Sequence, residues 1–140
     1  MSMIIDNYPQ YQLYLLTLHL LGIKESLIPE KCDSRCVDAT IINRAYYSSY
    51  LYCELWLEKI HNFKVKHPWE FKKGEKHIGE HKQIRNALYD HGEKETEYLL
   101  KKLAKLRKKA DYYPYKEITP YDINTSIKHM EKIFNCLKLK

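Results

Sequence analysis

The stretch Asp38–Ile60, DATIINRAYYSSYLYCELWLEKI, decides the fold class of this chain. Its apolar residues recur at helical spacing and form one stripe: Ile41, Ala45, Cys53, Trp56 and Ile60. Because positions three or four residues apart share one face of a helix, the pattern predicts a long helix with this stripe turned toward the core. We expect it to be the central helix of the domain.

The segment before the central stretch continues the helical periodicity. A first helix is predicted from about Pro9 to Leu21, and Gly22 is a plausible stop because glycine commonly follows a helix end. The residues expected on its buried face are Leu13, Leu16, Leu20 and Leu21. The sequence thus predicts one helix on the N-terminal side of the centre.

Two more helices are predicted after the central stretch. The dipeptide His67-Pro68 interrupts the pattern, because the residue before a proline disfavours helical backbone. A third helix is expected over Glu75–Tyr89, stopping at Gly92, and a fourth from about Glu93. The inner face of the fourth helix is expected to comprise Leu99, Leu103, Leu106 and Ala110.

The last helix has the clearest start signal in the chain. Thr119 is a suitable N-cap, Pro120 fits the first turn, and Asp122 follows three residues after the cap. Its buried face is predicted to comprise Ile123, Ile127, Met130, Ile133 and Phe134. Since alternating apolar stretches with hairpin turns are absent from the sequence, we predict an all-α domain of about five helices.

Length and charge narrow the class of protein. The chain has 140 residues, which predicts a single domain over residues 1–140 that is large enough to bury its own core. The formal net charge of +6 favours acidic partners such as nucleic acid or an anionic protein, although a lysine-rich composition has the same effect.

The N-terminal residues 1–6 lack a basic segment followed by an apolar one, so we predict no secretory signal. The most apolar stretch, Tyr14–Ile23, is shorter than the roughly 20 residues that cross a bilayer. The four cysteines are therefore read as reduced thiols, and we expect a cytoplasmic protein without a membrane segment.

Three short motifs occur in a characteristic order. Asn43–Tyr47 contains Arg-Ala-Tyr-Tyr in the central helix, His81-Lys82 precedes another helix, and Arg107–Tyr112 reads Arg-Lys-Lys-Ala-Asp-Tyr before the capped last helix. In this order and spacing the chain resembles the small prokaryotic HEPN proteins, and the resemblance covers most of the sequence. It implies an antiparallel helical bundle that forms a homodimer, often with a nucleotidyltransferase partner, in toxin-antitoxin or phage-defence loci.

Many HEPN proteins are ribonucleases that need no metal or cofactor, so the resemblance implies RNA as the partner. Their motif is an arginine followed four to six residues later by a histidine. Arginine would stabilise charge developing on phosphorus, and histidine would move a proton to or from a ribose oxygen. Here Arg107 and Arg44 are the candidate phosphate-holding residues, and Tyr112 stands where the ribonuclease motif would place its histidine.

Tyrosine is a poor general base at neutral pH, so the proton-transfer group must lie elsewhere. Arg85 and His91 satisfy the arginine-to-histidine spacing, but they lie one helix before the expected motif. His81, in the second matching motif, is the other candidate. The sequence leaves open whether the segment from Arg85 or the segment from Arg107 is functional.

The fourth helix is strongly basic between Lys101 and Lys109, with six positive side chains and no acid. The RNA-binding residues we predict are Lys101, Lys105, Lys108, Lys109, Tyr47 and Tyr113. The alternative is that the lysines form a solvated surface, that the arginines pair with acids such as Glu54 or Asp111, and that most tyrosines are packing residues.

A zinc site is a further alternative, because Cys32, Cys36, His77 and His81 occur as two pairs with helical spacing. Free thiols and surface histidines explain these residues better, and we predict no metal. The expected function is RNA binding at a basic cleft, with metal-independent cleavage as its possible chemistry. The alternative is a non-catalytic helical adaptor for a nucleotidyltransferase or another defence protein.

Overall fold

The computed structural model describes residues 8–27 and 34–139, and their regular structure is entirely helical. The helices are α2 (Pro9–Leu27), α3 (Ser34–His61), the short 3-10 helix η1 (Pro68–Glu70), α4 (Glu80–Asp90), α5 (Lys94–Tyr112) and α6 (Pro120–Cys136). The predicted all-α class with about five helices is therefore confirmed. None of the described helices is long and apolar enough to cross a membrane.

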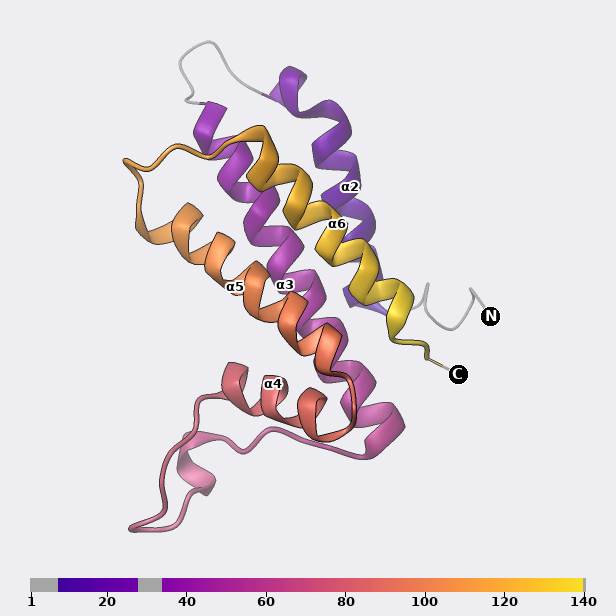
Figure 1. Ribbon diagram of the computed structural model, residues 1–140, viewed down its shortest axis with the longest axis vertical. Coiled ribbons are helices and arrows are strands. Elements are labelled where there is room, and N and C mark those ends of the chain that lie inside the picture. Colours follow the sequence, from indigo (N-terminus) through magenta and orange to yellow (C-terminus); the bar gives the residue numbers. More distant parts are fainter. Residues whose placement is uncertain (1–7, 28–33, 140) are drawn as a thin grey trace.

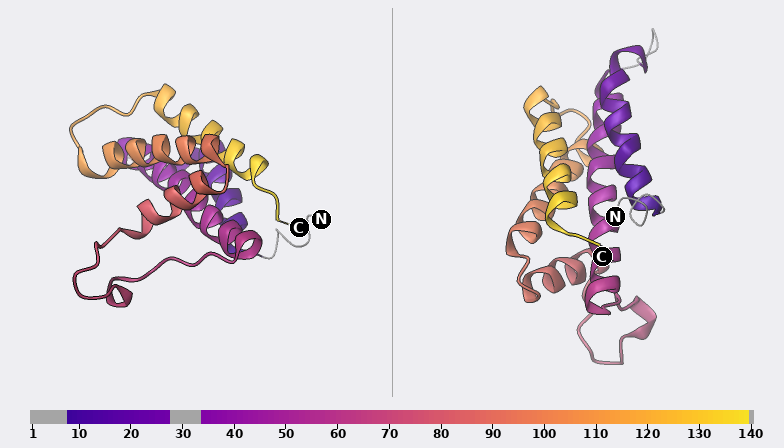
Figure 2. Two further views of the ribbon diagram at one scale, coloured as in Figure 1. Left: turned by 60° about the horizontal axis from the view of Figure 1, so that its bottom comes forward. Right: turned by 90° about the vertical axis from the view of Figure 1, so that its right-hand side faces the viewer.

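Helix α3 is the centre of the bundle, as predicted, and packs against α2, α4, α5 and α6. Figure 1 shows α2 and α3 running in opposite directions, as do α5 and α6. In the right-hand view of Figure 2, α2 covers one side of α3 while α5 and α6 cover the other. The segment between α3 and α4 projects from one end of the bundle (Figures 1 and 2).

The predicted apolar stripe of α3 is buried except at its end. Ile41, Ala45 and Cys53 have no exposed surface and Trp56 is 7% exposed, whereas Ile60 is 42% exposed. Ile60 belongs to the last turn of α3, close to the projecting segment, so its burial was wrongly predicted. Tyr52 completes the core by stacking on Phe134, with 4.1 Å between ring centroids.

Helix α2 differs from the prediction in its length and in the face that it buries. It continues through Gly22 to Leu27, so the predicted stop was wrong. Leu16 was also wrongly predicted to be buried, since it is 47% exposed while the neighbouring Thr17 is fully buried. Thr17 tolerates this position because its hydroxyl donates to the Leu13 carbonyl oxygen at 2.8 Å within the same helix.

Helix α4 begins at Glu80, five residues later than the predicted Glu75, with Gly79 as its extended N-cap. Residues 75–79 are not helical because they form the return limb of the projecting segment. The predicted stop at Gly92 is confirmed, since Gly92 has a φ of +86°, where a side chain would be strained.

Helices α5 and α6 follow the prediction closely. Thr119 caps α6 by accepting a hydrogen bond from the Asp122 backbone N–H, and the Asp122 side chain accepts one from Thr119 in return. The Asp122 carboxylate also pairs with Lys109 of α5 at 2.7 Å. The predicted inner faces are buried in both helices, apart from Leu106, which is partly exposed.

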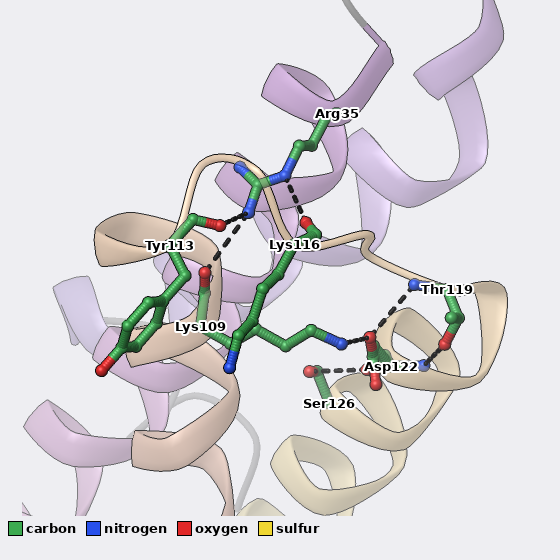
Figure 3. Close-up of polar contacts among 7 residues, drawn as sticks. All are labelled: Arg35, Lys109, Tyr113, Lys116, Thr119, Asp122 and Ser126. Atoms are coloured by element: carbon green, nitrogen blue, oxygen red, sulfur yellow. Dashed lines mark hydrogen bonds and ion pairs between the residues drawn. The ribbon is translucent and has the colours of Figure 1, made fainter.

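Arg35 ties the loop between α5 and α6 to the start of α3 (Figure 3). Its guanidinium donates to four backbone carbonyl oxygens, those of Lys109, Ala110, Tyr113 and Lys116, at distances from 2.7 to 3.3 Å. Two of these carbonyls, those of Lys109 and Ala110, belong to the last turn of α5, where the Lys109 carbonyl also accepts from the Tyr113 backbone N–H. Arg35 therefore fixes the end of the helix that carries Arg107.

Candidate functional site

Side chains of α3, α4 and α5 form a surface pocket of about 420 Å³. The lining residues are Tyr46 of α3, His81 and Arg85 of α4, and Lys101, Ala104, Lys105, Arg107, Lys108 and Tyr112 of α5. The structure thus brings together five predicted site residues of α5, namely Lys101, Lys105, Arg107, Lys108 and Tyr112, with the candidates His81 and Arg85 of α4. Because three helices contribute, the pocket exists only in the folded domain.

The wall formed by α5 follows from its helical spacing. Lys101, Lys105 and Lys108 lie four and then three residues apart, so they share one face of the helix. Ala104 lies on the same face, and its small side chain leaves space between the longer ones. The result is a hollow with flexible positive groups at its rim.

Arg107 is held in place by neighbours on two helices. Its Nε atom lies 2.9 Å from Asp111 Oδ2, and its Nη2 atom donates to the Tyr47 hydroxyl at 2.9 Å. Asp111 is held in turn by Asn43, whose Nδ2 donates to the same carboxylate oxygen at 2.9 Å. Within the part of the chain that the structure describes, these contacts engage Nε and Nη2 and no partner is found for Nη1, so the Nη1 side of the fork can meet a ligand.

Aromatic rings surround the Arg107 guanidinium. Its central carbon lies 5.2 Å from the ring centroids of Tyr47 and Tyr112 and 5.9 Å from that of Tyr46. Burial opposes the charge on Arg107, but Tyr47, Tyr112 and Asp111 outweigh this effect and raise its pKa above the ordinary value. The arginine is therefore a permanent, oriented cation in the pocket.

His81 is packed into the same site by tyrosines of α3. Its ring stacks on Tyr50 with 4.1 Å between centroids, and its Nδ1 atom forms a hydrogen bond with the Tyr46 hydroxyl. Burial and the charges of Arg107 and Arg85 lower the pKa of His81, while Glu80 acts in the opposite direction. The imidazole is therefore neutral at neutral pH.

The hydrogen bond with Tyr46 couples the tautomer of His81 to the role that its other nitrogen, Nε2, can play. Burial raises the pKa of Tyr46 to about 12, although Arg107 acts against this, so the phenol keeps its proton. If Tyr46 donates to Nδ1, the His81 proton lies on Nε2, which can then donate to a phosphate or leaving oxygen. If Tyr46 accepts instead, Nε2 has a free lone pair and can act as a base.

A titration of His81 by NMR tests this electrostatic picture. Its midpoint is expected below the ordinary value of about 6.5, and Arg107→Ala is expected to raise it because a nearby positive charge is removed. The pKa of His129 provides an internal control, since it is lowered by burial and by Lys132 and Lys102. A His81 midpoint that did not move would contradict the coupling to Arg107.

Because the pKa of His81 is lower in the folded protein than in the unfolded chain, the neutral imidazole stabilises the fold and its protonation destabilises it. The contribution of this residue to stability is present above the unfolded pKa of about 6.5 and is lost as the pH falls below it. Arg107→Ala should weaken this dependence on pH. Urea unfolding at neutral and mildly acidic pH would measure the change.

The pocket is strongly cationic. Five basic residues line it, namely Arg85, Lys101, Lys105, Arg107 and Lys108, and no carboxylate is among its described lining residues. Such a surface attracts phosphate and lacks the oxygen ligands that Mg²⁺ or Ca²⁺ requires. No group of three or more His, Cys, Asp or Glu side chains in the described part of the chain could hold a metal ion.

Two predicted catalytic residues lie outside this pocket. Arg44 is exposed on α3 and does not belong to the described lining. His91 stacks on His61 with 3.8 Å between ring centroids, while Arg85 faces the pocket. The structure therefore separates the two ends of the segment from Arg85 to His91 and joins Arg107 with His81.

Of the predicted RNA-binding residues, Lys101, Lys105 and Lys108 line the pocket and the other three do not. Lys109 pairs with Asp122 instead of lining the pocket. Tyr113 is 43% exposed beyond the end of α5 and lies under the Lys116 ammonium, whereas Tyr47 contacts Arg107 directly. Of the zinc candidates, Cys32 lies outside the described residues, Cys36 is an exposed free thiol, and His77 stacks on Phe71.

The sequence-based site omitted Tyr46, Ala104 and Asn43, which orient or shape the pocket. Asp111 enters only the alternative interpretation of the sequence, as an acid that pairs with an arginine, and the structure pairs it with Arg107. Helical spacing already placed Ala104 among the lysines of α5, but only the packing of α3 against α4 reveals that Tyr46 holds His81. Comparison of the chain with protein-family models, curated proteins and solved structures finds no match.

Proposed function

We propose that this protein is a HEPN-like domain that binds single-stranded RNA by holding a phosphate group in the Arg107 pocket. The observation that carries the proposal is the lining itself, in which the oriented Arg107 guanidinium is joined by four other basic residues and no carboxylate is among the described lining residues. Tyr112, which is 60% exposed, offers a ring on which an unpaired base can stack.

The proposal extends to metal-independent cleavage. The ribose 2'-oxygen would form a bond to phosphorus while the bond from phosphorus to the 5'-oxygen breaks, which gives a 2',3'-cyclic phosphate and a 5'-hydroxyl. Arg107 would stabilise the negative charge that develops on the phosphoryl oxygens. His81, held by Tyr46 and Tyr50, would take the proton from the 2'-hydroxyl as a neutral base and, as imidazolium, would pass that proton to the leaving 5'-oxygen.

The proposal includes a homodimer and a place in a toxin-antitoxin or defence system, as the resemblance implies. A dimer would bring two copies of the pocket into one assembly and lengthen the basic surface offered to RNA. Light scattering during size-exclusion chromatography would measure the mass of the assembly. A monomer at working concentration would remove this part of the proposal without affecting the pocket.

The salt dependence of RNA binding tests the phosphate contacts. If all five basic lining residues engage phosphates, log Kd should change with log salt with a slope of about 3.5, since each contact with a single strand adds about 0.7. Lys105→Gln should lower the slope by about 0.7. Lys128→Gln, which removes an exposed charge on α6, is the matched control.

Cleavage of the same RNA in EDTA tests the chemistry, with the 2',3'-cyclic phosphate as the diagnostic product. If the wild-type protein shows no affinity for RNA at low salt, the proposal is wrong. In that case tight copurification with a nucleotidyltransferase would favour the alternative function, a non-catalytic adaptor. An adaptor interface would also respond little to salt.

A further inference from the structure

The segment between α3 and α4 forms a structured arm that projects from the bundle (Figures 1 and 2). We define the arm as residues 62–79. Gln83 of α4 fixes both of its limbs, because its side chain bonds the backbone N–H and carbonyl of Lys66 and also the carbonyl of Ile78, at 2.7 to 2.8 Å. The arm therefore presents its side chains from a defined backbone.

Trp69 is the most informative side chain of the arm, since it is 78% exposed. One face of its indole stacks on His67, with 4.6 Å between centroids and 15° between planes. His67 is held by the Glu80 carboxylate, 2.8 Å from its Nδ1 atom. An indole supported on one face and exposed to this extent is a ready platform for a flat ring.

The tip of the arm is basic. Lys72, Lys73 and Lys76 are exposed around Gly74, whose φ of +84° forms the turn. Lys66 and Glu75 neutralise each other in an ion pair of 2.8 Å, so these three lysines dominate the charge of the tip. A stacking platform beside several lysines is the arrangement that grips single-stranded nucleic acid.

The inner side of the arm has the opposite character. Glu54, Glu58 and Glu70 line the groove between the arm and α3, together with His67 and Lys64. Phosphate would be repelled from this groove, so a bound strand should follow the outer side of the arm. The arm ends at Gly79, where α4 begins, and the first turn of α4 contributes His81 to the pocket.

We infer that the arm is a second contact for single-stranded RNA, in which Trp69 stacks on a base and Lys72, Lys73 and Lys76 meet the neighbouring phosphates of a strand held in the Arg107 pocket. This inference rests on the proposed function and goes further by predicting a minimum length for the RNA ligand. A strand that reaches both contacts must be several nucleotides long, because the pocket and the arm are separate surfaces.

The experiment compares a long and a short ligand with the full chain. For an oligouridylate of about 10 nucleotides, within the usual site sizes for single strands, Trp69→Ala should raise the Kd about tenfold, and Trp69→Phe should raise it less. For a uridine dinucleotide, which fills only the pocket, Trp69→Ala should leave the Kd unchanged. Fluorescence anisotropy measures the first ligand, and NMR shifts of His81 measure the second.

Tyr121→Ala is the matched control, since Tyr121 is 76% exposed at the start of α6, at the opposite end of the bundle from the arm (Figure 1). If the wild-type protein and Trp69→Ala bind the long RNA equally, the arm inference is overturned while the pocket remains. If wild type binds the long RNA but Arg107→Ala does not weaken it, the proposed function fails. If wild type binds neither ligand, both fail.

Discussion

Arg107→Ala is expected to weaken binding of single-stranded RNA about 10- to 100-fold, because a charge-assisted hydrogen bond to phosphate contributes about 1.5 to 3 kcal/mol. Cleavage should fall by a further factor of about 100, since a positioned donor also stabilises the transition state. Filter binding and product analysis in EDTA measure the two effects. The fold should survive, because Arg107 lines a surface pocket outside the hydrophobic core and Asp111 keeps its contact with Asn43.

Arg44→Ala is the matched control for Arg107→Ala, since it removes the same kind of side chain from an exposed position outside the pocket. It should change the affinity for RNA by less than about twofold. The loss of RNA affinity in Arg107→Lys should lie between the losses in these two variants. Lysine keeps the charge but cannot bridge Asp111 and Tyr47 with one planar fork. An equal loss in Arg44→Ala and Arg107→Ala would contradict a site confined to the pocket.

The parts of the fold that sequence predicted well depend on local chemistry. Thr119, Pro120 and Asp122 specify the start of α6 through hydrogen bonds between near neighbours, which any folded context preserves. The inner face of α6 follows from regular spacing of large apolar residues. Gly92 ended α4 as expected because its positive φ is a local requirement.

The wrong predictions of helix bounds depend on features of the folded chain that the periodicity of the sequence does not show. Gly22 remains helical because glycine ends a helix only where the chain turns into the left-handed region, and in the middle of a helix it merely costs about 1 kcal/mol. Residues 75–79 carry no strong helix breaker before Gly79, yet Gln83 and Glu75 hold them in the arm. Neither contact is visible in the periodicity of the sequence.

In the candidate site, too, the features set by spacing within one helix were predictable and the contacts between helices were not. The basic face of α5 was predictable, since Lys101, Lys105 and Lys108 follow helical spacing. The segment from Arg85 to His91 satisfied a linear motif, but six positions rotate a helical side chain by about 240°, so the two residues face different surroundings. The neighbour of Arg107 is instead His81, and only the packing of α4 against α5 brings them together.

Arg35→Ala is expected to lower the free energy of unfolding by about 3 kcal/mol, because it leaves carbonyls at the end of α5 and in the following loop without their cationic donor. The guanidinium also complements the negative end of the α5 dipole. The urea midpoint should fall by about 1 to 2 M. Arg44→Ala, on the same helix, should leave that midpoint nearly unchanged.

The effect of Arg35 should extend to RNA. Figure 3 shows Arg35 bonded to the carbonyls of Lys109 and Tyr113. Together with Ala110, which Arg35 also holds, these residues flank Asp111 and Tyr112, the partners of Arg107. Loosening this turn should weaken RNA binding under conditions where the variant is still folded. Arg35→Lys should recover less than half of the lost stability, because an ammonium group cannot span four carbonyls as a planar fork does. If Arg35→Ala and Arg44→Ala unfolded at the same urea concentration, the loop would be held by α5 and α6 alone, through Lys109 and Asp122.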